Sequence, residues 1–178
     1  MNLPNSLTIL RILLVPIFVG FLLYGHFDYA LASLVLAGLT DALDGTIARY
    51  ANQRTQLGAY LDPLADKLLL ASGFVTLAFL HLVPLWTVIL VVSRDIILMT
   101  GTVLARLTDA QVDVSPTMLG KGTTLFQLTY VILVVVLASR RMDLRLVEPI
   151  LYVMVTLTLM SGLHYLYRGY MRQGTGPA

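Results

Sequence analysis

Cysteine is absent from this chain of 178 residues, which excludes disulfide bonds and thiolate metal sites and removes any redox clue to its compartment. Charged residues are also scarce, at 12% of the chain against about 25% in an average soluble domain. The formal net charge is only +2, too small a basic excess to indicate a nucleic-acid partner. These absences argue against both an ordinary soluble domain and a nucleic-acid-binding protein.

Apolar residues are in excess instead: 57% of the chain is hydrophobic and the mean hydropathy is +0.81. A single core of this size cannot bury so many apolar side chains, so the composition predicts an integral membrane protein. We expect one all-α membrane domain over residues 1–178, with six transmembrane helices preceded by a short interfacial N-terminal helix. The expected spans are residues 7–24, 29–50, 58–80, 85–107, 122–138 and 149–167. The N-terminus lacks a basic segment followed by a small-residue cleavage site, so we interpret it as mature sequence.

The distribution of basic residues predicts the orientation of these spans. An even number of spans places both termini on one side, and with cytoplasmic termini that side receives seven basic residues. They are Arg11, Arg49, Arg54, Arg106, Lys121, Arg168 and Arg172. The opposite side receives only Arg140, Arg141 and Arg145, a cluster whose role the sequence does not explain. We therefore expect a multi-pass protein of a bacterial-type inner membrane, or of the mitochondrial inner membrane in a eukaryote, with cytoplasmic termini.

The most informative stretch of the chain is DALDGTIARYANQRTQLGAYLDPLAD, at residues 41–66, which lies between two apolar runs. It carries four of the ten acidic residues, namely Asp41, Asp44, Asp62 and Asp66. The first two are three residues apart and the last two are four apart, so each pair shares one face of a helix. Asp62 followed by Pro63 resembles a helix N-cap with proline at the first helical position, which predicts that the third span begins near these acids.

The residue types in this stretch predict a metal–diphosphate site. Two helices that each offer a pair of carboxylates can close around divalent cations, and ligation by oxygen alone suits Mg²⁺, Mn²⁺ or Ca²⁺ rather than zinc. Gly45, Ala48 and Gly58 lie among the acids, where their missing side chains let a bulky ligand approach the backbone. Arg49 supplies a planar fork suited to phosphate.

Two other interpretations of the acidic stretch remain open. The four acids can be solvated helix ends, although two same-face pairs with glycine and arginine between them disfavour this. They can also mark the path of a cation or proton transporter, since intramembrane carboxylates often do. A transporter is disfavoured because we find no repeated half and no broken helix elsewhere. It would also have no need for Arg49 or for a nucleotide-sized gap at the small residues.

A second charged group lies deep in the span at 85–107, where charge costs a few kcal/mol per residue. Arg94 and Asp95 are adjacent, about 100° apart around a helix, so they need not pair with one another. Either they form an internal ion pair, or Arg94 faces a polar cavity that leads to the acidic site. In the second case Arg94, Arg106 and Lys121 form a basic path that binds the phosphate of an acceptor.

The acidic stretch matches the pattern D-x2-D-G-x2-A-R-x8-G-x3-D-x3-D at every fixed position. These positions are Asp41, Asp44, Gly45, Ala48, Arg49, Gly58, Asp62 and Asp66. By this pattern the chain resembles the CDP-alcohol phosphatidyltransferases. The resemblance implies six transmembrane helices, a homodimer, and a cytoplasmic site that works with two divalent cations, Mg²⁺ or Mn²⁺.

The resemblance also implies roles for individual residues. The first three aspartates, Asp41, Asp44 and Asp62, would bind metal, and Asp66 would bind metal and act as the catalytic base. The CDP and diphosphate site would comprise Asp41, Gly45, Ala48, Arg49 and Gly58, with the small residues lining the cytidine pocket and the arginine holding the diphosphate.

Further segments bear on the subfamily. NLPNSLTILRILLVPIF (2–18) resembles the opening of both phosphatidylglycerophosphate synthases and eukaryotic-type cardiolipin synthases. AGLTDALDG (37–45), LDPLADKLLL (61–70) and SRDIIL (93–98) look closer to the cardiolipin synthases, and the other group is expected to carry Glu where Asp95 stands. The resemblance implies transfer of the phosphatidyl group of CDP-diacylglycerol to phosphatidylglycerol with release of CMP. The alternative acceptor is glycerol 3-phosphate.

Overall fold

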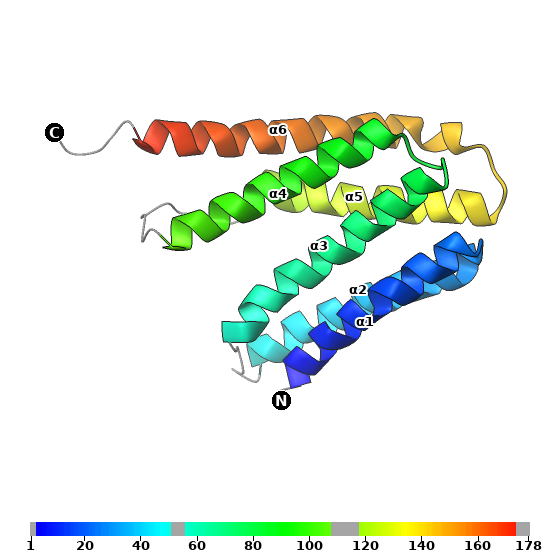
Figure 1. The fold of residues 1–178 in the computed structure, drawn as a ribbon, viewed down its shortest axis with the longest axis horizontal. Helices are drawn as coiled ribbons and strands as arrows, with labels where there is room; N and C mark the ends of the chain where they lie inside the picture. The colour runs from blue at the N-terminus through cyan, green and yellow to red at the C-terminus, as the bar shows by residue number, and fades with distance from the viewer. Residues whose placement is uncertain (1–2, 51–55, 108–117, 174–178) are drawn as a thin grey trace. The chain divides into compact units, whose positions relative to one another are not determined.

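The computed structural model describes residues 3–50, 56–107 and 118–173, with side chains described over 8–41, 64–101, 120 and 122–165. Within these residues every element is helical, which confirms the predicted all-α class (Figure 1). The elements are α1 (Leu3–Leu23), α2 (Phe27–Tyr50), α3 (Gln56–Phe79), α4 (Leu85–Leu107), α5 (Met118–Ser139), the 3₁₀ helix η1 (Leu144–Val147) and α6 (Glu148–Gln173). Each of the six expected spans corresponds to one α-helix.

Two predicted helix starts are wrong. α1 continues without a break from Leu3 to Leu23, so the described chain contains no separate interfacial helix before the first span. Pro4 falls in the first turn of α1, where a backbone N–H is not needed, so it begins the helix rather than interrupting it. α3 begins at Gln56, ahead of Asp62 and Pro63, so these two residues lie inside the helix and not at its start.

Two helical segments of the described chain are long and apolar enough to cross a membrane. They are Gly122–Ser139, with a mean hydropathy of 1.8, and Leu144–Tyr165, with a mean hydropathy of 1.7. A shorter apolar segment occupies Thr8–Leu23. The helices α2, α3 and α4 instead carry charged residues within their length, such as Asp41, Asp66 and Arg94. The six-span topology therefore stays a prediction.

Contacts divide the chain into two compact units, which are described separately here. The first comprises Met1–Pro84 and Val131–Leu144, and the second comprises Leu85–Tyr130 and Arg145–Ala178. The helix α5 thus contributes its first half to the second unit and its second half to the first. The single domain over residues 1–178 stays a prediction.

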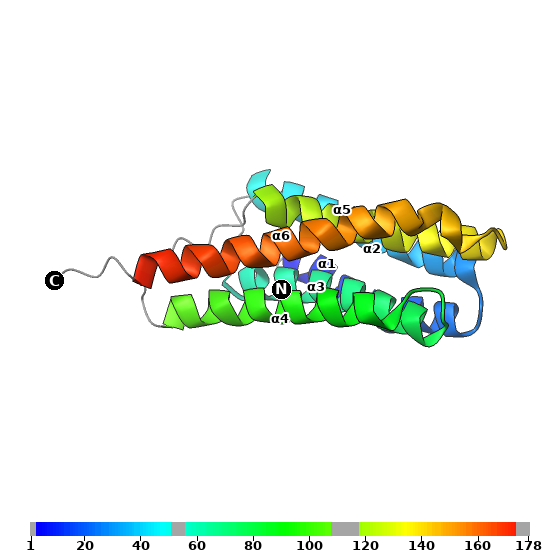
Figure 2. The same cartoon turned by 90° about the horizontal axis from the view of Figure 1, so that it is seen from above.

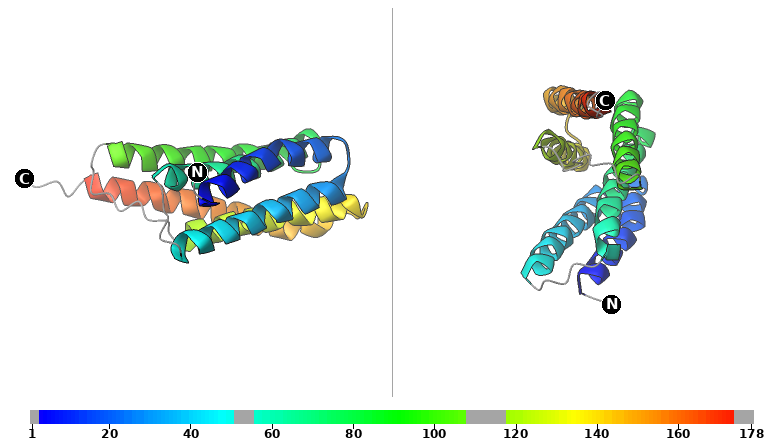
Figure 3. Two further views of the ribbon diagram at one scale, coloured as in Figure 1. Left: turned by 90° about the horizontal axis from the view of Figure 1, so that it is seen from below. Right: turned by 90° about the vertical axis from the view of Figure 1, so that its left-hand side faces the viewer.

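In the first unit, α1 packs against both α2 and α3. Its buried residues recur every three or four positions and form one stripe, namely Thr8, Arg11, Leu14, Phe18 and Leu22. A tight turn at Gly25, whose φ of 73° suits glycine, joins α1 to α2 (Figure 3). A Cβ at Gly73 of α3 would lie only 3.1 Å from Cε1 of Phe18, so the glycine permits close packing of the two helices. The stripe brings one cation, Arg11, into an otherwise uncharged surface.

In the second unit, α4 packs against α6, and Figure 2 shows the two helices alongside one another. Val88 and Val91 of α4 and Leu151 and Met154 of α6 are buried. The hydroxyl of Thr123 on α5 donates to the carbonyl of Leu157 on α6 at 3.3 Å. This unit holds the second charged group, at the middle of α4.

Candidate active site

Three helices of the first unit each bring one charged side chain to the same place. Nη2 of Arg11 on α1 lies 2.7 Å from Oδ1 of Asp41 on α2. Nη1 of the same guanidinium lies 3.3 Å from Oδ1 of Asp66 on α3. One planar fork therefore joins carboxylates from two different helices, with one terminal nitrogen on each carboxylate. The first and last aspartates of the acidic stretch are thus brought together.

Burial differs sharply between the arginine and its partners. The side chain of Arg11 is fully buried, whereas those of Asp41 and Asp66 are 48% and 45% exposed. A buried cation is costly unless anions pair with it, and here two carboxylates share that task. Because about half of each aspartate stays accessible, each carboxylate can accept a further ligand from the side away from Arg11.

The remaining residues of the predicted site lie on the same two helices. Asp44, Gly45, Ala48 and Arg49 belong to α2, and Gly58 and Asp62 belong to α3. Their side chains are outside the described residues, as are those of Arg106 on α4 and Lys121 on α5. Among the side chains that are described, no three acidic or histidine residues gather as a metal site. The roles assigned to these residues from the sequence stay predictions.

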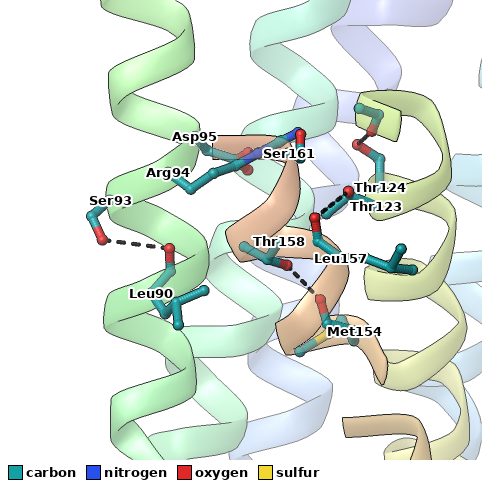
Figure 4. Close-up of polar contacts among 11 residues, drawn as sticks. Leu90, Ser93, Arg94, Asp95, Thr123, Thr124, Met154, Leu157, Thr158 and Ser161 are labelled. Carbon is teal, nitrogen blue, oxygen red and sulfur yellow. Dashed lines mark hydrogen bonds and ion pairs between the residues drawn. The ribbon is translucent and has the colours of Figure 1, made fainter. Parts of the chain in front are cut away.

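The second charged group is a buried ion pair. Nη1 of Arg94 lies 2.7 Å from Oδ1 of Asp95, and both residues are only 7% exposed. Nη2 of Arg94 donates to the hydroxyl of Ser161 on α6 at 2.6 Å (Figure 4). The first of the two alternatives, an internal ion pair, is therefore present, because the long arginine side chain reaches around the helix to its neighbour.

Arg94 also lines a cavity, but this cavity is mainly apolar, whereas the alternative expected a polar cavity that leads to the acidic site. The cavity, of about 210 Å³, lies between α4 and α6 within the second unit. Apart from Arg94, Ser93 and Thr158, its walls are apolar or glycine: Leu90, Ile97, Leu98, Leu159, Gly162 and Leu163. The cavity belongs to the second unit and the acidic residues belong to the first. The acceptor role of Arg94 therefore stays a prediction.

Sequence reasoning missed Arg11 as a member of the site and counted it only as a basic residue that orients the chain. A usable signal was present. A cation inside the apolar run at 7–24 must face protein, water or an anion, and the stretch at 41–66 carries four of the ten acids of the chain. Ser161 was missed too, because a serine in an apolar helix has no pattern that reveals its partner.

Comparison with known proteins decides the family. The family model described as CDP-alcohol phosphatidyltransferase matches residues 1–163, which is most of the chain. The chain belongs to the CDP-alcohol phosphatidyltransferase family. With its two membrane-length apolar segments, this CDP-alcohol phosphatidyltransferase is a membrane protein.

Three curated relatives of this CDP-alcohol phosphatidyltransferase carry three different names. Cardiolipin synthase (CMP-forming) of Homo sapiens is 42% identical over 106 residues, covering 59% of this chain and 35% of the human protein. CDP-diacylglycerol–glycerol-3-phosphate 3-phosphatidyltransferase of Bacillus subtilis is 35% identical over 184 residues, covering 92% of this chain and 93% of the relative. A probable phosphatidylglycerophosphate synthase of Mycobacterium tuberculosis is 32% identical over 174 residues, covering 94% and 81%. The match thus spans about a third of the human relative and most of the two bacterial ones.

Proposed function

We propose that this protein transfers the phosphatidyl group of CDP-diacylglycerol to the hydroxyl of a glycerol-type acceptor, and that the acceptor is phosphatidylglycerol, giving cardiolipin and CMP. The observation that carries the proposal is the meeting of Asp41 and Asp66, from two helices, on one guanidinium in a member of this family. Carboxylates gathered at one place suit phosphoryl-group chemistry far better than scattered solvated helix ends would. Family membership likewise disfavours a cation or proton transporter.

The donor set fits divalent cations. Asp41 and Asp66 offer only oxygen, which Mg²⁺ and Mn²⁺ prefer, and both keep about half of their side chains accessible. The guanidinium between them marks a place where positive charge is stabilised. Asp41, Asp44, Asp62 and Asp66 would hold the two ions. When bound, the ions neutralise the charge of the diphosphate and of the departing CMP.

The residues of the chain perform the remaining steps. Asp66 accepts the proton of the acceptor hydroxyl, whose oxygen attacks the phosphorus that bears diacylglycerol. The bond from that phosphorus to the CMP oxygen breaks, and CMP leaves. Gly45, Ala48 and Gly58 leave room for the cytidine, while Arg49 binds the diphosphate. Arg94, Arg106 and Lys121 would bind the phosphate of the acceptor.

A second acceptor, glycerol 3-phosphate, is favoured by one observation. The Bacillus subtilis relative named for that acceptor matches this chain over nearly the whole length of both proteins. The human cardiolipin synthase is more identical, but over a shorter stretch. The segments around Asp95 and the aspartates resemble the cardiolipin synthases, so we rank phosphatidylglycerol first.

The proposed setting is a membrane that the chain crosses six times, with both termini and the acidic site on the cytoplasmic side. Pairing of Arg11 with two aspartates removes it from the surface charges that orient the chain, and six basic residues remain on that side against three. The protein would work as a homodimer, with its lipid substrates entering from the bilayer.

One assay tests the proposal and separates the acceptors. Purified protein in mixed micelles receives labelled CDP-diacylglycerol and Mn²⁺ or Mg²⁺, with phosphatidylglycerol or glycerol 3-phosphate supplied separately. We expect CMP release and cardiolipin with phosphatidylglycerol. Product formed only from glycerol 3-phosphate would transfer the proposal to the alternative acceptor. If CMP is released neither with phosphatidylglycerol nor with glycerol 3-phosphate, the proposal is refuted. Asp28→Asn, a change at an exposed acid outside the site, is the control variant and should behave as the unaltered protein does.

A further inference from the structure

Arg11 has an unusual position for a cation. It occupies one position of the buried stripe of α1, between Thr8 and Leu14, and its side chain has no exposed surface. Both of its terminal nitrogens face carboxylates, one from α2 and one from α3. An arginine that served only to orient the chain or to bind a surface phosphate would keep its guanidinium in water.

The described part of this group contains more acid than base. One guanidinium faces the two carboxylates of Asp41 and Asp66, so these three side chains together sum to a net negative charge. Without the guanidinium, two carboxylates held close together would repel each other and favour separation of α2 from α3. With it, the carboxylates stay together while half of each remains accessible.

We propose that Arg11 is an internal counter-cation of the metal site, which holds Asp41 and Asp66 together before a divalent ion binds and opposes the binding of that ion by its charge. This inference rests on the metal site of the proposed function. Because both the ion and the guanidinium are stabilised by the same two carboxylates, their effects are negatively coupled. Such coupling is reciprocal. If a bound ion weakens the stabilisation that Arg11 provides, removing Arg11 strengthens ion binding by the same factor.

A purely positioning role makes the opposite prediction. If Arg11 only arranged the carboxylates, its loss would disorder the ligands and weaken ion binding. We expect the charge effect to dominate, because repulsion between a buried cation and a divalent ion on the same carboxylates would be poorly screened. A divalent ion can also gather two half-exposed carboxylates by itself, so little arrangement is lost.

The experiment compares the unaltered protein with Arg11→Met, which keeps the length of the side chain and removes its charge. Mn²⁺ binding is titrated by electron paramagnetic resonance in detergent, without donor or acceptor, and Tm is measured in EDTA and in Mn²⁺. We expect Mn²⁺ to bind the variant at least about tenfold more tightly. In EDTA the Tm of the variant is expected to be lower, and the rise in Tm on adding Mn²⁺ larger.

Two control variants separate charge from packing. Arg11→Lys keeps the charge, so its Kd for Mn²⁺ should stay within a few-fold of the unaltered value. Arg94→Met removes a second buried arginine of the described residues, which pairs with Asp95 in the second unit. It should lower Tm without changing Mn²⁺ binding.

Unchanged or weaker Mn²⁺ binding in Arg11→Met would overturn the inference. If that variant folds only with Mn²⁺, the inference is supported; if it folds in neither condition, Arg11→Gln and Arg11→Lys decide. Tighter binding in the Gln variant supports the counter-cation, and equal binding overturns it. Absence of specific Mn²⁺ binding in the unaltered protein would overturn both the metal site and the inference. Negative coupling in a protein without transferase activity would overturn the proposed function alone.

Discussion

Among the side chains that the structure describes, two arginines are buried in ion pairs, and they differ in the number and the exposure of their partners. Arg11 joins carboxylates from two other helices, whose side chains are 48% and 45% exposed. Arg94 pairs with its sequence neighbour Asp95, whose side chain is 10% exposed, and with a hydroxyl on α6. The three described side chains of the first group sum to a net negative charge and two of them are about half-exposed, whereas the arginine and the aspartate of the second sum to zero and are mostly buried.

The difference indicates how to distinguish a reactive charged cluster from one that serves packing. A neutral, enclosed pair has no capacity for a metal cation, because its single carboxylate is already paired with the arginine. A cluster with one carboxylate in excess and accessible oxygens can bind a cation. On our proposal Arg11 lies at the metal site, whereas Arg94 lines the cavity between α4 and α6.

Metal removal should give the largest effect. We expect excess EDTA to abolish CMP release, because oxygen ligands from the accessible cluster supply the site that the donor diphosphate requires. Readdition of Mn²⁺ or Mg²⁺ should restore it, since Arg11 keeps the empty site folded. Full turnover in EDTA would remove the chemical difference between the two charged groups.

Asp66→Asn should come next. The amide keeps the shape of the side chain and one oxygen but cannot accept a proton, so kcat should fall by about 10²–10⁴-fold. Affinity for CDP-diacylglycerol, measured by equilibrium binding in micelles, should change much less. Asp28→Asn is the matched control, since Asp28 is an exposed acid whose Oδ1 accepts a bond from Ser139. Near-normal kcat in Asp66→Asn would require a different base.

Arg94→Ala tests the second of the two charged groups. If Arg94 binds the acceptor phosphate, loss of one charge-assisted contact should cost about 1.5–3 kcal/mol, which is roughly ten- to a hundredfold in acceptor KM or kcat. Donor affinity should stay nearly constant. A purely structural pair predicts a lower Tm with normal acceptor kinetics in the surviving protein, and that outcome would remove Arg94 from the acceptor site.

The smallest effect is expected at Ser161. Its hydroxyl accepts a bond from Arg94 at 2.6 Å, and Ser161→Ala should lower the free energy of unfolding by about 1–2 kcal/mol. Thermal unfolding in detergent measures this change. Thr156→Ala on the same helix is the control, because that hydroxyl is exposed and bonds only within its own helix turn. An equal shift in both variants would mean that the bond to Arg94 contributes nothing.

Helix positions were accessible from the sequence because apolar runs separated by turn residues define them. The span expected at 85–107 is α4, Leu85–Leu107. Local start signals misled at Asp62 and Pro63, because the preceding residues Gln56 to Leu61 are compatible with helix and extend it. The cap pattern therefore had no structural consequence there.

The candidate site was partly accessible for a similar reason. Spacing within one helix placed Asp41 and Asp66 on chemically useful faces, and the structure brings the two together. What spacing cannot reveal is a partner from another helix, so Arg11 was missed. Nor does an angle around a helix determine pairing, because side-chain length decided that Arg94 reaches Asp95.

The close approach of Phe18 to Gly73 has a consequence for Arg11. Two contacts between α1 and α3 have the same spacing in the sequence. Arg11 and Asp66 are 55 positions apart, and so are Phe18 and Gly73. The two contacts therefore belong to one parallel alignment of the helices and lie about 10 Å apart along them. Sliding α1 by one residue along α3 would break both contacts at once. Gly73, which has no side chain, thus helps to set the register in which Arg11 reaches Asp66, although Gly73 lies away from both residues.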